Sequence, residues 1–275
     1  MDTHSFNLPR YLARIGLAGA ESLPPDGATL AAVQRAHATT IPFENLDPLL
    51  GRPVSLELAD LEAKLAAGRR GGYCFEQNHL LGAALDALGF TVTRLAGRVR
   101  WMAPSDRPDG SRTHMCLRVD LPNGPWLADV GFGGHLMTTP LRLERELVQD
   151  TPAGTFRLTG DDRLLLQTRF PSGWVDMYRF TLDPAPPIDY IVGNWYTATH
   201  PASKFTNDLL IQLATPTGRT TLFNTTLTER TFAGASTERT LRNAAELAEV
   251  LEKTFAIDPP ADPAIIWGRI SGGAE

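Results

Sequence analysis

The sequence predicts an α+β protein in which a helical region, a strand-rich region and a mixed region follow one another. Apolar residues recur at helical spacing up to about residue 90, alternate with polar residues from about 91 to 186, and combine both patterns in 187–275. At 275 residues and 43% hydrophobic content, the chain can bury a large core in one large domain or two to three small ones. We therefore expect regions with limits at 1–90, 91–186 and 187–275.

In the first region, helices are expected from polar capping residues, three-four apolar spacing and glycine stops. Asp26 and Ser55 are the expected caps of two helices, and Gly68 ends the second of them. A further helix is expected from Cys74 to just before Gly89. The first helix is expected to run through Leu30, Val33 and Gln34, and the second through Leu58, Leu61 and Leu65. In the third, one buried stripe is expected, at Leu81, Ala84, Leu85 and Leu88.

Cys74 stands where this last helix begins, directly after Gly71, Gly72 and Tyr73. The glycines permit a sharp turn into the helix, so we expect the sulfur to face a neighbouring element and to be accessible. Free N–H groups and the positive end of the helix dipole favour a thiolate at such a position. Cys74 is therefore a candidate nucleophile, and the alternative is a small buried hydrophobic residue.

His114 has the best context of the six histidines to act as the base for this thiolate. Residues 113–119 alternate as a strand, and a Pro-Asn-Gly-Pro turn at 122–125 leads into a second strand at 126–130. The resulting hairpin brings Asp129 back along the face that holds His114. The bend Val-Gly-Phe-Gly-Gly at 130–134 follows, where a ligand could approach the backbone.

The register of this hairpin decides what Asp129 contacts. A two-residue Asn-Gly loop pairs Asp129 with Arg118, which gives an ordinary cross-strand ion pair. A slightly longer loop places Asp129 directly opposite His114, with Cβ atoms about 4.5–5.5 Å apart, so that the carboxylate can orient the imidazole. The sequence alone leaves both registers open.

Further strand and helix signals extend to the C-terminal region. A strand is expected at 91–101, and a hairpin is expected at 164–178 around the turn Pro-Ser-Gly at 171–173. In the third region, strands are expected at 209–213 and 220–224, together with a helix. That helix repeats apolar residues at Leu247, Val250, Leu251 and Phe255.

These residues together resemble the arylamine N-acetyltransferases. The resemblance rests on Arg-Gly-Gly-Tyr-Cys-Phe-Glu at 70–76, Thr-His at 113–114 and Asp-Val-Gly-Phe-Gly at 129–133. It extends to Ile-Pro-Phe-Glu-Asn-Leu at 41–46, Asn-Trp-Tyr-Thr-Ala-Thr-His-Pro at 194–201 and Ser-Lys-Phe at 203–205. The motifs stand in order over about the whole chain, and the match is loose after Phe205.

The resemblance implies an N-terminal helical bundle, a central β-barrel and a C-terminal α/β lid, with a cysteine-protease-like triad of Cys74, His114 and Asp129. It implies a bacterial-type enzyme that transfers the acetyl group of acetyl-CoA to an arylamine or arylhydrazine by a ping-pong route through an acetyl-cysteine. The expected oxyanion donors are the backbone N–H groups of Cys74 and Thr113. The expected substrate-binding residues are Phe43, Val99, Phe132 and Phe205. Lys204 and Arg219 are candidates for contacts with coenzyme A phosphates, whereas Arg70 is expected to be a structural hydrogen-bond donor.

Composition adds expectations about partners and location. A net charge of −5 and a pI of about 5.7 argue against nucleic acid and anionic membranes as partners. No signal peptide or spanning segment is evident, so we expect a cytoplasmic protein with reduced Cys74 and Cys116, the latter structural. Histidine and cysteine spacing fits no zinc site, so we expect no metal and no bound cofactor, with acetyl-CoA as cosubstrate. His135 and His200 are expected at the surface or lining a pocket, and a homodimer is left open.

Alternatives to arylamine acetylation, with its expected role in xenobiotic metabolism, stay open. One is an amide synthase that closes a macrocycle in a biosynthetic pathway. Another is a cysteine hydrolase in which the same triad uses water as the acceptor. A ligand-binding homologue without catalysis is the third.

Overall fold

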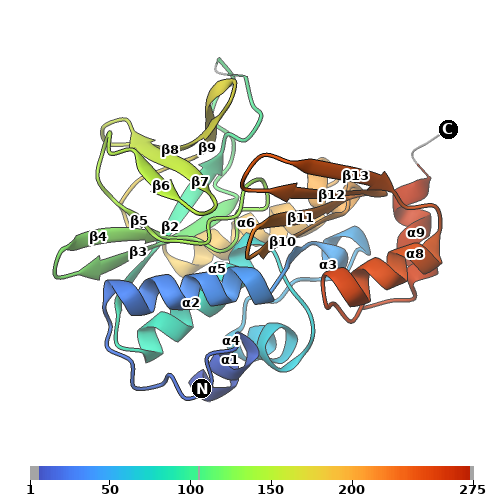
Figure 1. Cartoon of the computed structure of the whole chain (residues 1–275), viewed down its shortest axis with the longest axis horizontal. Coiled ribbons are helices and arrows are strands. Elements are labelled where there is room, and N and C mark those ends of the chain that lie inside the picture. Colours follow the sequence, from blue (N-terminus) through green and yellow to red (C-terminus); the bar gives the residue numbers. More distant parts are fainter. Residues whose placement is uncertain (1–5, 105, 273–275) are drawn as a thin grey trace.

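The computed structural model describes residues 6–104 and 106–272, and it shows helices, a strongly curved sheet and a second sheet flanked by helices (Figure 1). This order confirms the α+β class that the sequence predicts. The limits at 1–90, 91–186 and 187–275 stay a prediction.

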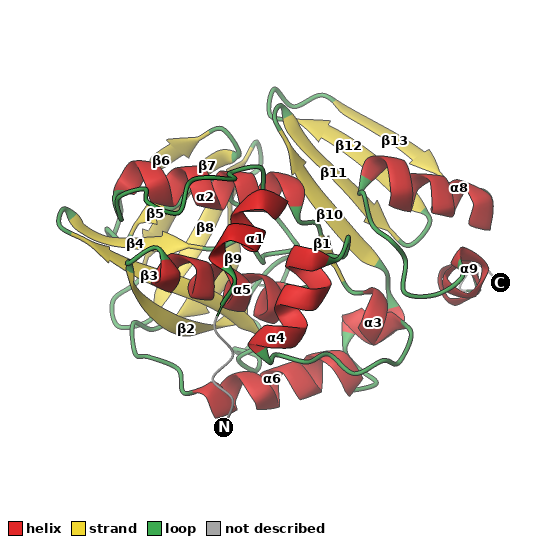
Figure 2. Ribbon diagram, turned by 90° about the horizontal axis from the view of Figure 1, so that it is seen from below, coloured by secondary structure: helices red, strands yellow, loops and turns green. Residues whose placement is uncertain are grey.

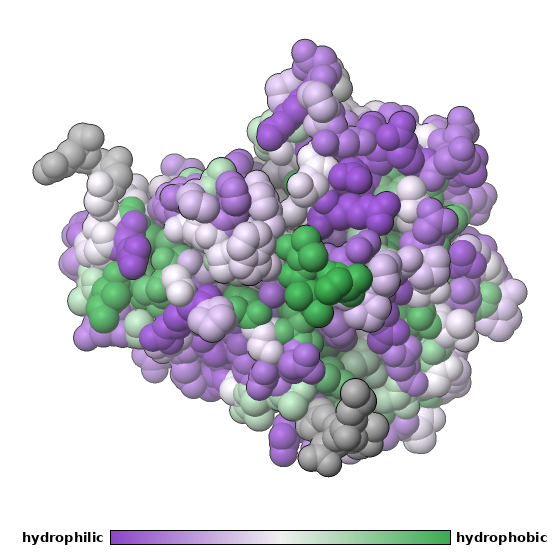
Figure 3. Space-filling model, turned by 180° about the vertical axis from the view of Figure 1, so that it is seen from behind, coloured by the Kyte–Doolittle hydropathy of each residue, from purple (hydrophilic) through white to green (hydrophobic). Residues whose placement is uncertain are grey.

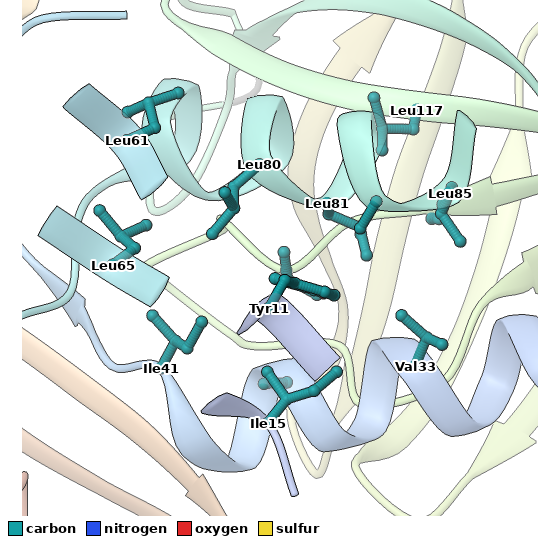
Figure 4. Close-up of a cluster of buried hydrophobic side chains, with 14 of the residues drawn as sticks. Tyr11, Ile15, Val33, Ile41, Leu61, Leu65, Leu80, Leu81, Leu85 and Leu117 are labelled. Atoms are coloured by element: carbon teal, nitrogen blue, oxygen red, sulfur yellow. The ribbon is translucent and has the colours of Figure 1, made fainter. Parts of the chain in front are cut away.

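The N-terminal helices pack around α5, which begins at Cys74. Figure 4 shows Leu80, Leu81 and Leu85 of α5 near Tyr11 and Val33, and all of these side chains are buried. The apolar stripe expected on this helix is therefore confirmed. The elements of this part are α1 (Leu8–Arg14), α2 (Gly27–Thr40), α3 (Leu46–Leu49), α4 (Leu58–Leu61), the π-helix η1 (Glu62–Ala67) and α5 (Cys74–Ala87).

One of the two predicted helix caps is confirmed and the other is wrong. Asp26 caps α2, because its carboxylate accepts a hydrogen bond from the Thr29 N–H at 2.9 Å. The cap of α4 is Glu57, and the Ser55 hydroxyl accepts from the Glu57 N–H and donates to Asp60 instead. The short turn at Ser55 therefore lies before the helix.

The curved sheet has the order β5-β4-β3-β2-β9-β8-β7-β6 within the described part of the chain. Strand β3 of this sheet separates two hydrophobic cores. Its residues Met115, Leu117 and Val119 pack against the helices, whereas Cys116 packs on the inner face of the curved sheet. Cys116 is thus buried and structural, as expected. The strands are β2 (Thr91–Val99), β3 (His114–Leu121), β4 (Gly124–Ala128), β5 (Leu141–Arg142), β6 (Gln149–Thr151), β7 (Gly154–Thr159), β8 (Leu164–Phe170) and β9 (Gly173–Phe180).

The two edge strands of this sheet are joined by one side chain. The Gln149 amide accepts from the Arg142 N–H at 2.8 Å and donates to the Arg142 carbonyl at 3.0 Å. The side-chain amide thus makes the two hydrogen bonds that the backbone of a neighbouring strand would make, and it links β5 to β6. The sheet is a nearly closed barrel, and the hairpin expected around 171–173 joins β8 to β9 in it.

The second sheet draws its first strand from the N-terminal region. Its order is β1-β10-β11-β12-β13 among the residues described, with β1 (Phe43–Glu44) paired to β10 (Leu210–Thr215). Helices α8 and α9 lie on one side of it (Figure 2), over a core that includes Leu222, Leu247 and Leu251. The other elements are β11 (Gly218–Phe223), β12 (Thr226–Thr231), β13 (Ser236–Thr240), α7 (Lys204–Asn207), α8 (Ala244–Glu249), the π-helix η2 (Val250–Thr254) and α9 (Pro263–Ser271).

Helix α6 (Pro187–Thr199) packs on the helical part through one face and exposes an apolar second face. Tyr190 is buried in the helical core, and the Asn194 amide donates to the Val54 carbonyl at 2.9 Å. The outer face exposes more than half of Ile188, Ile191, Val192 and Trp195. A hydrophobic patch occupies the middle of the view from behind (Figure 3), the side on which α6 lies. No described helix is both long and apolar enough to cross a bilayer.

Candidate active site

Cys74 is the first residue of α5, and its surroundings leave it almost no exposed surface. Its exposed fraction is 4%, so the expected accessible sulfur is not found. The bend after Asp129 covers it closely, since a Cβ on Gly131 would lie 2.6 Å from the Cys74 Cα. As a thiol, Cys74 Sγ donates to the Thr113 carbonyl at 3.4 Å. Cys74 is therefore covered by the segments next to His114 and Asp129, namely Thr113 and the bend at Gly131.

His114 and Asp129 form a buried pair beside this sulfur. His114 Nε2 lies 2.7 Å from Asp129 Oδ2, and both side chains are buried. Burial alone would lower the pKa of His114, but the Asp129 carboxylate and a hydrogen bond with Cys74 raise it to about 10. With Nε2 held by Asp129, the remaining ring nitrogen, Nδ1, is the one available to Cys74. The sulfur thus faces an imidazolium that stays charged at neutral pH.

Neither of the hairpin registers expected from the sequence occurs. The two-residue loop is Pro122-Asn123, and Leu121 pairs with Gly124. Strand β4 ends at Ala128, which pairs with Leu117, so Asp129 lies beyond the last paired residue. Arg118 instead makes its ion pair with Asp120 at 2.8 Å. The Asp129 carboxylate therefore reaches His114 from beyond the end of β4, without a direct cross-strand pairing.

Asn78 fixes the orientation of Asp129, and sequence reasoning missed it. Its amide donates to Asp129 Oδ1 at 2.9 Å, while its oxygen accepts from the Val130 N–H at 3.0 Å. The Gly131 N–H adds a bond of 2.8 Å to the same carboxylate oxygen. Burial would raise the pKa of Asp129, but His114 and these donors hold it below its usual value. The i+4 spacing from Cys74 on one helix face was the signal that could have found Asn78.

A buried charge cluster supports the start of α5. Arg70 Nε donates to Glu44 at 2.8 Å and its Nη2 donates to Asp47 at 2.9 Å, which confirms Arg70 as a structural donor. Lys64 lies 2.6 Å from both Asp47 and Glu76. Glu76 in turn accepts from the Tyr73 N–H at 3.1 Å, next to Cys74. The cluster therefore holds the turn that presents the cysteine.

The four predicted substrate-binding residues stay predictions, and one of them, Phe132, directly contacts the triad. The Phe132 ring centre lies 5.3 Å from that of His114. Phe43 and Phe205 are in contact, with ring centres 5.8 Å apart. Val99 is 41% exposed and pairs with Tyr178, whose ring centre is 4.4 Å from that of His114.

Surface hollows give no guide to this site. Two of them, of about 440 and 350 Å³, share His79 and Arg94 and are not lined by any of the three triad residues. We assign the site from the triad, because perturbed titratable groups held in contact are the stronger sign of chemistry. In the part of the chain that the structure describes, no group of three or more His, Cys, Asp or Glu residues could hold a metal ion.

Comparisons with known proteins point to one family. A family model described as N-acetyltransferase matches residues 26–262. The arylamine N-acetyltransferase of Mycolicibacterium smegmatis is 44% identical over 259 residues, which cover 92% of this chain and 93% of that protein. The Escherichia coli arylamine N-acetyltransferase is 43% identical over 253 residues, covering 91% and 88%. The structure of the Mycobacterium marinum enzyme in complex with CoA matches with a TM-score of 0.91 and 39% identity, covering 97% of this chain and 99% of that one.

The fold, which brings a cysteine, a histidine and an aspartate together, is that of an acyltransferase. The chain belongs to the arylamine N-acetyltransferase family.

Proposed function

We propose that this chain transfers the acetyl group of acetyl-CoA to the nitrogen of an arylamine or arylhydrazine through an acetyl-Cys74 intermediate. The observation that supports it most is the buried His114–Asp129 pair at 2.7 Å beside Cys74. The CoA complex of the M. marinum relative supports acetyl-CoA as the cosubstrate.

In the first half-reaction, the Cys74 thiolate attacks the thioester carbonyl carbon. The tetrahedral oxyanion is stabilised by the backbone N–H groups of Cys74 and Thr113. When the C–S bond to the coenzyme breaks, the coenzyme thiolate takes a proton from His114. The products are acetyl-Cys74, free coenzyme A and a neutral imidazole.

In the second half-reaction, the amine nitrogen attacks the acetyl carbon of acetyl-Cys74. His114 accepts the proton that the nitrogen loses, and the Cys74 thiolate leaves beside the imidazolium. Phe43, Val99, Phe132 and Phe205 suit a flat aryl group, because aromatic rings pack well against aromatic and apolar walls. After the two half-reactions, Cys74 is again a thiolate and His114 is again an imidazolium.

Replacement of the two cysteines tests this proposal. We expect Cys74→Ala to abolish amine-dependent consumption of acetyl-CoA, because Cys74 carries the sulfur that is paired with His114. Cys116→Ala should keep most of the activity, since Cys116 packs inside the barrel. Acetyl-CoA consumption that does not need an amine would favour the hydrolase alternative, and an active Cys74→Ala protein would contradict the proposal.

A further inference from the structure

Arg219 is a half-buried cation at the contact between the second sheet and the barrel. Its Nη1 lies 2.7 Å from His135 Nδ1, and His135 Nε2 donates to the Ala153 carbonyl at 3.1 Å. The ring therefore has its proton on Nε2 and accepts from Arg219 at Nδ1. Burial and the neighbouring arginines lower the pKa of His135 to about 3, so it remains a neutral acceptor. His135 thus fixes the direction of the guanidinium.

A second arginine stands beside the first on the same face of the sheet. Arg219 of β11 pairs directly with Arg230 of β12, an arrangement that is unfavourable for like charges. Over residues 6–104 and 106–272, neither forms an ion pair with a carboxylate. Glu238 lies on the same face, opposite Thr228, and does not reach Arg230. Two guanidinium groups in this arrangement suit an anion with several oxygens, above all a phosphate.

This face of the sheet continues to the active site. Gln212 pairs with Phe43 on one side and Thr221 on the other, and Thr221 stands two residues from Arg219 on β11. Side chains of directly paired residues, and of residues two apart on one strand, lie on the same face of a sheet, so the side chains of Phe43 and Arg219 lie on one face. Gln212 is buried, and its Oε1 has no hydrogen-bond partner among the described residues. The face therefore offers polar contacts between the aryl-binding residues and the arginines.

Both ends of this face touch the bend that covers Cys74. A Cβ on Gly133 would lie 2.6 Å from the Phe43 ring, and Arg219 contacts His135 two residues further on. A series of ring contacts then leads from His135 to the triad. The ring centres are 6.3 Å apart for His135 and Trp101, 5.7 Å for Trp101 and Phe132, and 5.3 Å for Phe132 and His114. A long, flexible arm could therefore join an anion at Arg219 to a thioester at Cys74.

We propose that Arg219, oriented by His135 and assisted by Arg230, binds phosphate groups of coenzyme A. The inference rests on the proposed function for the identity of the acyl donor. Coenzyme A has its thioester at one end of an extended arm and its phosphates at the other, which fits the separation of Cys74 and Arg219. In a chain of net charge −5, such a polyanion needs local positive charge, and this arginine pair supplies it.

The test compares acetyl donors with and without phosphate. In Arg219→Gln, kcat/KM for acetyl-CoA should fall about 10-fold or more, as expected for a lost charged hydrogen bond. Its kcat/KM for p-nitrophenyl acetate and for the arylamine should stay unchanged, because these steps use no phosphate contact. Arg230→Gln should show the same pattern to a smaller degree. Arg239→Gln is the matched control, because Arg239 pairs with Leu227 and so faces the opposite side of the sheet.

A binding measurement separates this inference from the proposed function. Calorimetry should show that 3′,5′-ADP binds the unmodified protein and binds Arg219→Gln about 10-fold or more weakly. This result would support the phosphate site even if neither donor acetylated Cys74, an outcome that would contradict the proposed function. Equal losses with both acetyl donors, or no loss with either, would overturn the inference. So would inorganic phosphate that binds as tightly as 3′,5′-ADP, because the site would then not select the coenzyme.

Discussion

His114 determines the chemistry at the scale of single residues, through the charge that it keeps while buried. Its pKa lies well above the ordinary value of 6.5, so its stabilising pairing is complete below about pH 6.5 and is lost as pH rises through about 10. Asp129 has a lowered pKa, so its contribution is present above its ordinary value of 3.8 and is lost as pH falls below it. The charged pair therefore persists across the neutral range, which keeps a cation beside Cys74.

The reactivity of Cys74 should reflect this cation. Alkylation by iodoacetamide should vary little between about pH 6 and 9, because the imidazolium that favours the thiolate stays charged. In His114→Ala the rate should instead rise with pH like that of an ordinary thiol, near pH 8.5. Quenching the reaction at set times and detecting the modified peptide by mass spectrometry measures the alkylation rates of both proteins. His200→Ala is the control, since His200 stacks on Tyr196 and takes no part in the triad. A native profile like that of free cysteine would argue against activation.

The decisive element is the start of α5, where five charged side chains meet below the nucleophile. Lys64 stands among Glu76, Glu44 and Asp47, and their charges raise its pKa despite the opposing effect of burial. Arg70 completes the cluster through Glu44 and Asp47. Because Glu76 accepts the Tyr73 N–H, loss of this balance should disturb the turn that holds Cys74.

Removal of Lys64 should therefore reduce both stability and catalysis. In Lys64→Met, the buried Glu76 loses its ion pair with Lys64 and Asp47 keeps only its pair with Arg70. We expect the free energy of unfolding to fall by about 3 kcal/mol. Urea denaturation measures this change, and acetyl transfer should fall with it because the helix start loosens. Lys253→Met removes an exposed pair with Glu249 and should leave stability unchanged. Equal effects of the two substitutions would mean that burial of the cluster does not matter.

At the scale of the whole molecule, the site exists because three parts of the chain converge on one bend. Helix α5 brings Cys74 and Asn78, the barrel brings His114 and Asp129, and the second sheet touches residues 130–135. The residues of the triad could be predicted from local patterns, since each has a helix-start, strand or turn signal nearby. The contact between these residues could not be predicted, because it depends on the residue at which β4 ends and not on how β4 pairs with β3.

Long-range pairings account for most of what the sequence did not predict. Strand β1 consists of Phe43 and Glu44 alone, too short for any periodicity, and it joins a sheet whose next strand begins at Leu210. Gln149 closes the barrel through side-chain bonds that leave no sequence pattern. Arg219 could be named as a candidate from its charge, but His135 and Arg230 became its neighbours only through folding. Local spacing thus predicts elements, while sheet order decides which of them share a site.

The most direct test of the account is intact-protein mass analysis after incubation with acetyl-CoA alone, followed by addition of an arylamine. We expect the protein to gain one acetyl group, peptide mapping to place it on Cys74, and the amine to discharge it faster than water does. Double-reciprocal plots against acetyl-CoA at several amine concentrations should then be parallel, as a ping-pong route requires. Intersecting lines with no acetyl-protein would point to direct transfer in a ternary complex and would contradict the covalent role of Cys74.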